Sequence, residues 1–83
     1  HSYEAEVAVI GALLAAPSCI IDHADKLVPD YFFIESHRIV AEAAVELLLE
    51  QIPTDLINVH ERLKYKGQEQ AVGELDGLRH FLP

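Results

Sequence analysis

Residues 35–51, ESHRIVAEAAVELLLEQ, decide the fold class because their apolar positions recur with the period of an α-helix. Spacings of three and four positions place these side chains on one broad stripe of a helix. Pro53 cannot continue a helix, so the stretch ends before it. The pattern predicts the longest helix of the chain, with this stripe: Ile39, Val40, Ala43, Ala44, Leu47 and Leu48.

The segment before this helix also reads as helical. Ser2 is suited to cap a first helix, and Glu4 and Glu6 lie in its first turn, where the helix dipole favours acids. Gly11 inside this helix predicts a close neighbour, because glycine otherwise weakens a helix. A short second helix is expected over Ser18–Lys26. The expected buried stripe of the first helix is Tyr3, Val7, Ile10 and Leu14, widened by Val9 and Leu13.

Between the second and third helices, residues 30–33 form a turn with three aromatics, of which we expect at least two to enter the core. His37 and Arg38 begin the long helix, although the dipole disfavours cations at that end. This placement predicts a tertiary contact, for example from Arg38 to a carboxylate or carbonyl of another element, with Glu35 offsetting its charge.

A fourth helix is predicted over residues 56–66, capped by Thr54 or Asp55 and followed by Gly67. A helical turn over 68–72 and a weak last helix over 74–82, with Gly77 inside it, complete the chain. No segment alternates as a strand does. We therefore predict an all-α fold, a small orthogonal bundle of about five or six helices in a single domain over residues 1–83.

The composition excludes several functions. The chain has 14 acidic residues against six Lys plus Arg, a net charge of -8, so its surface repels phosphate and direct binding of nucleic acid is not expected. The longest uncharged apolar run, residues 7–16, is too short to span a bilayer, so no membrane role is expected. A single cysteine fits a reducing, cytoplasmic setting.

Catalytic motifs are missing from the sequence. None of the four glycines precedes a lysine as a phosphate-binding loop requires, so we expect no cofactor, no catalytic residue and no ATP hydrolysis by this chain alone. Cys19 and His23 lie four residues apart on one helix face, but a zinc site needs three or four ligands. A buried cysteine beside a surface histidine is the favoured interpretation. A small metal protein or enzyme is the alternative, which elemental analysis would exclude.

Two charged rows are candidates for contacting a partner protein. Three glutamates lie four residues apart on the long helix, on a face that must meet water or a basic partner. The second row is the polar side of the fourth helix, whose basic residues are also explained by the dipole at its end. The candidate partner-binding residues are Glu42, Glu46 and Glu50 in the first row, and His60, Arg62, Lys64 and Lys66 in the second.

Four motifs in order resemble the N-terminal domain of DnaB-family replicative DNA helicases over nearly the whole chain. They are the opening His-Ser-Tyr-Glu-Ala-Glu; Pro29 with Phe32, Phe33 and His37-Arg38; Pro53 with Asp55, Leu56 and Val59; and Val72-Gly73. The chain departs from the family where Glu74 replaces a second glycine and Gly77 replaces an aromatic residue. Phe33 also replaces the usual tyrosine.

The resemblance implies a non-catalytic domain for protein interaction in DNA replication. In that family this domain builds the collar of a hexameric ring with the other helicase subunits, and receives primase and, in some systems, a helicase loader. A helical hairpin, a linker and the motor that uses ATP and Mg²⁺ would follow this fragment. The alternative is a stand-alone acidic regulator of the same fold that binds a helicase. A phosphate-binding loop further along the gene would favour the helicase, and a stop codon the regulator.

Overall fold

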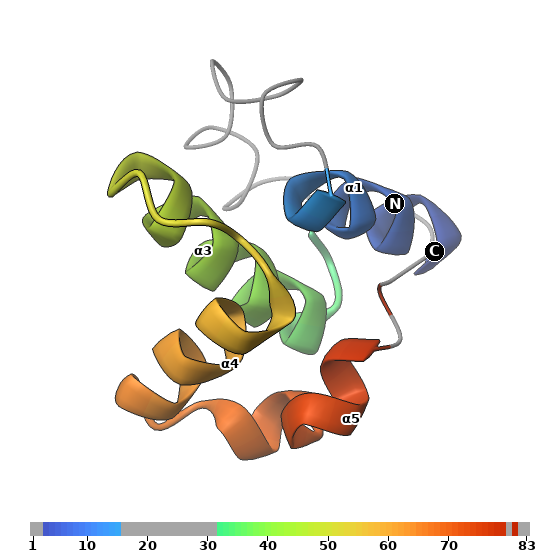
Figure 1. Cartoon of the computed structure of the whole chain (residues 1–83). Helices are drawn as coiled ribbons and strands as arrows, with labels where there is room; N and C mark the ends of the chain where they lie inside the picture. Colours follow the sequence, from blue (N-terminus) through green and yellow to red (C-terminus); the bar gives the residue numbers. More distant parts are fainter. Residues whose placement is uncertain (1–2, 16–31, 80, 82–83) are drawn as a thin grey trace.

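The computed structural model describes residues 3–15, 32–79 and 81, and all regular structure within them is helical. This confirms the all-α prediction. The predicted second helix, Tyr31, Cys19 and His23 lie outside the described residues. The elements are α1 (Tyr3–Ala15), α3 (Glu35–Leu49), α4 (Leu56–Tyr65), the 3₁₀-helix η3 (Glu69–Val72) and α5 (Glu74–Arg79) (Figure 1).

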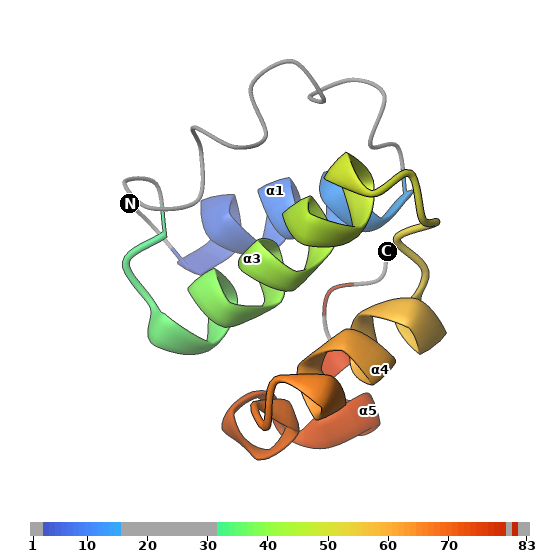
Figure 2. The same ribbon diagram turned by 90° about the vertical axis from the view of Figure 1, so that its left-hand side faces the viewer.

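Helix α3 is the centre of the bundle. It contacts α1 on one side and α4 and η3 on the other, while α5 packs against α4 and η3. Figure 2 shows α1 and α3 side by side, with α4 and α5 together beyond them. The predicted stripe of α3 is buried apart from Leu48, which is partly buried. Ala41 and Val45 are buried as well, because neighbours cover more than one face of this helix.

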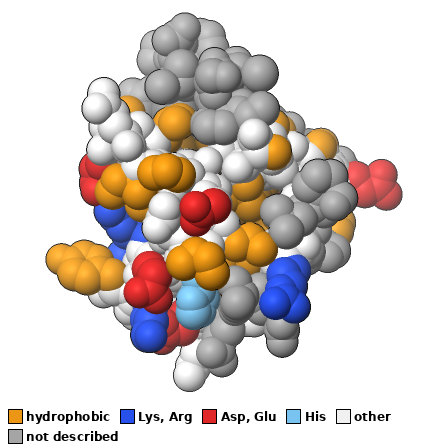
Figure 3. All heavy atoms as spheres, in the orientation of Figure 1, with side chains coloured by type: hydrophobic (Ala, Val, Ile, Leu, Met, Phe, Trp, Pro, Cys, Tyr) orange, Lys and Arg blue, Asp and Glu red, His pale blue; other side chains and the backbone are white. Residues whose placement is uncertain are grey.

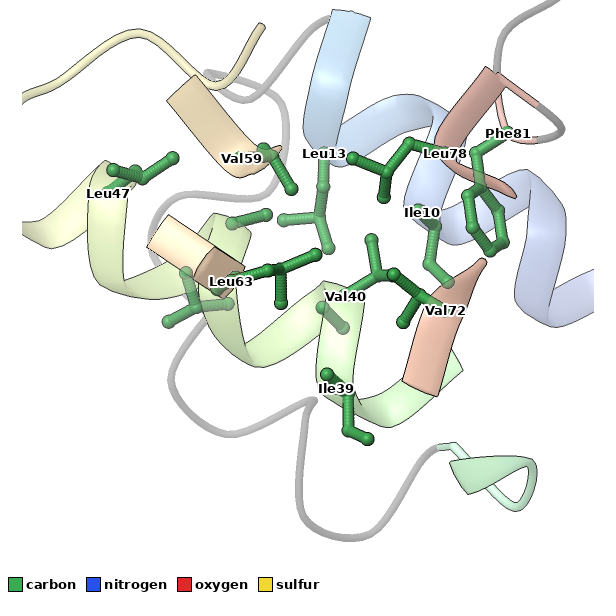
Figure 4. Close-up of a cluster of buried hydrophobic side chains, with 14 of the residues drawn as sticks. Ile10, Leu13, Ile39, Val40, Leu47, Val59, Leu63, Val72, Leu78 and Phe81 are labelled. Atoms are coloured by element: carbon green, nitrogen blue, oxygen red, sulfur yellow. The ribbon is translucent and has the colours of Figure 1, made fainter. Parts of the chain in front are cut away.

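The core gathers around Val40. Ile10 and Leu13 reach it from α1, Val59 and Leu63 from α4, and residues of η3, α5 and the following segment close the far side (Figure 4). Phe32 is also buried, as predicted, whereas Phe33 is 82% exposed. Phe32 therefore meets the expectation that aromatics of this turn enter the core, and Phe33 does not enter it. Tyr31 lies outside the described residues, so a second buried aromatic stays a prediction.

The buried face of α1 differs from the predicted stripe. Glu6, Ile10 and Leu13 are its buried residues, whereas Tyr3 is half exposed. The prediction is confirmed for Ile10 and Leu13, and Val7, Val9 and Leu14 pack against the core while partly buried. It is wrong for Tyr3, and it left out Glu6, which it explained as an acid favoured by the helix dipole. The helix is instead rotated so that a carboxylate enters the protein.

The Glu6 carboxylate is 1% exposed and accepts three hydrogen bonds from the start of α3. Its Oε2 accepts from the Phe33 backbone N–H at 3.0 Å, and its Oε1 from the Ile34 N–H at 3.3 Å. Oε1 also lies 2.9 Å from Nδ1 of His37. An ionised carboxylate can only accept, so this ring nitrogen carries the proton. Because Ile34, the N-cap of α3, provides no side-chain cap, Glu6 caps the helix from another element.

His37 connects this contact to both ends of the described chain. Its ring lies 5.1 Å from the ring of Tyr3, tilted by 53°, and 5.4 Å from that of Phe81 in an edge-on arrangement. The tertiary contact predicted for the His37-Arg38 pair is therefore made by His37. Arg38 lies 3.9 Å from Glu35 on its own helix, which confirms the predicted local pairing of charges.

The loop between α3 and α4 is fixed by two side chains. Asp55 caps α4 by accepting from the Asn58 N–H at 2.8 Å. Buried Thr54 donates to the carbonyl oxygen of Leu13 at 2.7 Å, which ties the loop to the end of α1. Of the two predicted cap residues, Asp55 is therefore the cap, and Thr54 is a tertiary contact.

Two glycines allow backbone segments to approach closely. A Cβ at Gly11 would lie 3.1 Å from the Phe81 carbonyl oxygen, so the predicted close neighbour is the segment after α5. At Gly77 a Cβ would lie only 1.7 Å from the carbonyl oxygen of Val72. Helix α5 therefore packs directly on the end of η3, at a position where the resemblance implies an aromatic residue. The last helix also ends earlier than predicted, at Arg79.

We expect Glu6→Gln to destabilise the domain at neutral pH by about 2 kcal/mol, since charge-assisted hydrogen bonds are lost in a buried place. Burial would raise the pKa of the Glu6 carboxyl, but hydrogen bonds from Phe33, His37 and Ile34 and the attraction of His37 lower it below 4.5. The wild-type advantage is then complete above about pH 5 and disappears as pH falls through the lowered pKa.

Urea unfolding of both proteins at about pH 7 and about pH 3 measures this difference. Glu4→Gln is the matched control, because Glu4 is an exposed acid of the same turn and its change should cost less than about 0.5 kcal/mol. Equal losses for the two variants at neutral pH would contradict the role of Glu6.

We expect Gly77→Ala to lower the free energy of unfolding by about 3 kcal/mol or more, since its Cβ would collide with backbone that cannot move cheaply. Gly67→Ala is the control: Gly67 has a φ of 71° and open space around it. This variant should lower the free energy of unfolding by only about 1–2 kcal/mol, because alanine is disfavoured in the left-handed conformation. Urea unfolding followed by circular dichroism compares them, and equal losses would mean that the close approach of α5 and η3 is unimportant.

Candidate functional site

The two charged rows predicted as separate candidates meet in the structure. Arg62 on α4 donates to both carboxylate oxygens of Glu50, the C-cap residue of α3, at 2.9 and 2.7 Å. It also donates to Oε1 of Glu46 at 3.0 Å. The Lys66 ammonium lies 2.6 Å from Oε2 of Glu46. For Glu46 and Glu50, the basic partner expected for the acidic face is therefore Arg62 and Lys66 of the same chain.

The pKa shifts reflect this pairing. Hydrogen bonds from Arg62 lower the pKa of Glu50. Partial burial would raise the pKa of Glu46, but hydrogen bonds from Lys66 and Arg62 outweigh it and lower the pKa. The two carboxylates raise the pKa of Arg62 in turn, chiefly through Glu50. Glu46, Glu50 and Arg62 are therefore charged at neutral pH, and the network joins α3 to α4.

Three of the predicted site residues stay outside this network. Glu42 and His60 are half-buried and Lys64 is exposed, and no ion pair joins them to other described residues. The structure therefore unites Glu46, Glu50, Arg62 and Lys66, and leaves Glu42, His60 and Lys64 at its border.

A shallow groove with a volume of about 480 Å³ lies beside the network, between the end of α3 and the outward side of α4. Acidic, basic and hydrophobic side chains lie side by side over α4 (Figure 3). The sequence analysis did not predict most of the groove residues. Tyr65, an aromatic residue on the polar side of the fourth predicted helix, was a signal in the sequence that could have indicated a binding surface. The groove is lined by Leu47, Glu50, Ile52, Asn58, Glu61, Arg62 and Tyr65.

Metal chemistry finds no support among the described residues. No group of three or more histidine, cysteine or carboxylate side chains is placed there to hold an ion. The Cys19–His23 pair lies outside the described residues. In the described part of the chain, no helix has both the length and the apolar character needed to cross a bilayer.

The fold places the chain among small all-helical domains, and comparison with known proteins identifies the family. The DnaB-like helicase N-terminal domain family matches residues 1–82. The chain therefore belongs to this family, as the sequence motifs indicated. No solved structure gives a significant match.

Curated relatives agree with this assignment. The chain is 37% identical over 73 residues to the replicative DNA helicase DnaB of Pasteurella multocida, covering 88% of this chain and 16% of the relative. It is 33% identical over 82 residues to that of Synechocystis, covering 99% and 9%. The helicase of the Buchnera symbiont of Acyrthosiphon pisum is 35% identical over 78 residues, covering 94% and 17%. The chain thus spans less than a fifth of the length of these relatives.

We expect Arg62→Gln to lower the urea midpoint of the domain, because it leaves Glu46 and Glu50 facing each other without their shared cation. Lys64→Gln removes the same charge from the same helix at an exposed position and should leave the midpoint unchanged. The difference between the variants should shrink at high salt, since these charges are partly exposed. Equal midpoints at low salt would show that the network does not stabilise the pair of helices.

Proposed function

We propose that this chain is the non-catalytic N-terminal domain of a replicative DNA helicase, and that it works by binding other proteins. The observation that carries the proposal is the family match over residues 1–82, to a domain of relatives that are named as replicative helicases. The sequence itself has no phosphate-binding loop, which fits a division of labour in which a separate motor domain uses ATP and Mg²⁺.

In this proposal the domain contributes to the collar of a hexameric ring and offers a docking surface to primase or a helicase loader. Its charge of -8 supports protein rather than DNA as the partner, because an acidic surface repels the phosphate backbone and attracts basic proteins. The same charge fits a cytoplasmic replication protein that stays soluble at high concentration.

The surface formed by α3 and α4 is the proposed place of docking. It carries the seven charged residues predicted from the sequence, but four of them satisfy one another. Reversing Arg62 would therefore disturb the fold as well as binding. Lys64 is the member whose replacement best reports on a partner alone, because it is exposed and forms no ion pair within the described residues, whereas Glu42 and His60 are half-buried.

Isothermal titration of the chain with the C-terminal domain of the primase from the same organism tests this proposal. We expect saturable binding that weakens as salt is added, because an acidic surface contributes to it. Absence of heat at high protein concentration, also with the downstream hairpin included, would contradict primase docking. The same titration with double-stranded DNA is the control, and there we expect no binding.

A further inference from the structure

Helix α4 carries a second row of side chains that the core does not use. Ile57, Glu61 and Tyr65 lie four residues apart, so they follow one another along one face of the helix. Ile57 is 62% exposed and Tyr65 is 88% exposed. The buried residues of α4 are Val59 and Leu63, on its other side. An apolar–acidic–apolar row thus points to solvent.

This row borders the groove between α3 and α4. Glu61 and Tyr65 line one wall, and Leu47 and Ile52 line the other. The double hydrogen bond between Arg62 and Glu50 joins the two walls, so the groove is fixed before any partner arrives. A preformed site of this kind loses little conformational entropy on binding.

The charged side chains that line the groove differ in whether they form ion pairs. Arg62 is fully engaged by Glu50 and Glu46. Glu61 is exposed and forms no ion pair with any described residue. The free charge of the groove is therefore negative, and it lies between the two exposed apolar side chains of the row.

We propose that this groove binds one amphipathic helix of a partner protein, with a lysine or arginine between apolar residues. The cation would pair with Glu61, while the apolar residues would pack on Tyr65, Ile57 and Ile52. Aromatic residues are typical anchors of protein interfaces, and a charge pair at the rim fixes the register of the helix. The inference rests on the proposed function, since it locates the docking of the partner protein.

A second copy of this chain is a poor occupant of the groove. Two copies with a charge of -8 each repel one another. Arg62 and Lys66 of the copy would already be paired with its own glutamates, which leaves Lys64 as the single lysine or arginine of its charged row on α4 with no ion pair to a described residue. A nucleic acid backbone is disfavoured for the same reason, since it would place phosphates beside Glu61 and Glu50. A basic, apolar helix satisfies both features of the groove at once.

Nuclear magnetic resonance of the ¹⁵N-labelled full chain, titrated with the primase C-terminal domain, tests the inference. We expect the largest amide shift changes at Ile52, Ile57, Glu61 and Tyr65. Glu61→Lys should weaken binding at least about tenfold at low salt and less at high salt. Tyr65→Ala should weaken it about tenfold at any salt concentration. Both side chains are exposed, so circular dichroism should report unchanged folding.

The control is Glu4→Lys, the same change of charge at an exposed acid of α1, which should alter the affinity by less than about twofold. If the primase domain binds with shift changes elsewhere and both groove variants bind normally, the inference is overturned and the proposed function stands. If no binding occurs at all, the proposed docking fails, and the inference fails with it. Self-association of the chain that Tyr65→Ala abolishes would also overturn it, by assigning the groove to a second copy.

Discussion

One buried carboxylate determines how the first helix of this domain can pack. A charged group removed from water is costly unless hydrogen bonds replace its hydration, and Glu6 finds them only at the start of α3. This requirement sets the rotation of α1, and with it the burial of Ile10 and Leu13. It also accounts for His37 at the start of α3, because the Nδ1 of this ring is a partner of the carboxylate. Phe81 packs on the same ring, so the end of the described chain depends on the same contact.

Local patterns predicted most of the secondary structure and little of this contact. The apolar period gave α3 and α4 within two residues of their observed ends, and Asp55 was one of two predicted caps. Glu6 escaped prediction because an acid in a first helical turn is ordinarily explained by the helix dipole. Its donors lie 27 to 31 residues further along the chain, and no local pattern connects them. Tyr3 was wrongly assigned to the core because the prediction used only the spacing of apolar residues. That spacing does not reveal that α1 is rotated to bury the acid Glu6.

The sequence predicted the residues of both charged rows of the candidate site, but not that the two rows join in one network. The acidic row and the basic row were both recognised, but as alternatives. The short connection between α3 and α4 could have suggested that they pack as neighbours whose rows meet. The groove was harder to foresee, because its wall depends on the turn after α3, where Gln51 adopts a positive φ of 64° and brings Ile52 back toward Leu47. Only coordinates place Tyr65 opposite these residues.

Ion pairs within the fold determine which charged residues of this domain remain available to attract a partner. Arg62 and Lys66 belong to a network within the fold, so they contribute little attraction for an acidic partner. The acids outside that network, Glu42 and Glu61 on the same two helices, keep their charge available. A surface of this kind speeds the encounter with basic proteins and slows the approach of DNA. In the proposed function, the ion pairs are therefore the support of the proposed docking surface, and the unpaired acids with the exposed aromatic are the part proposed to select a partner.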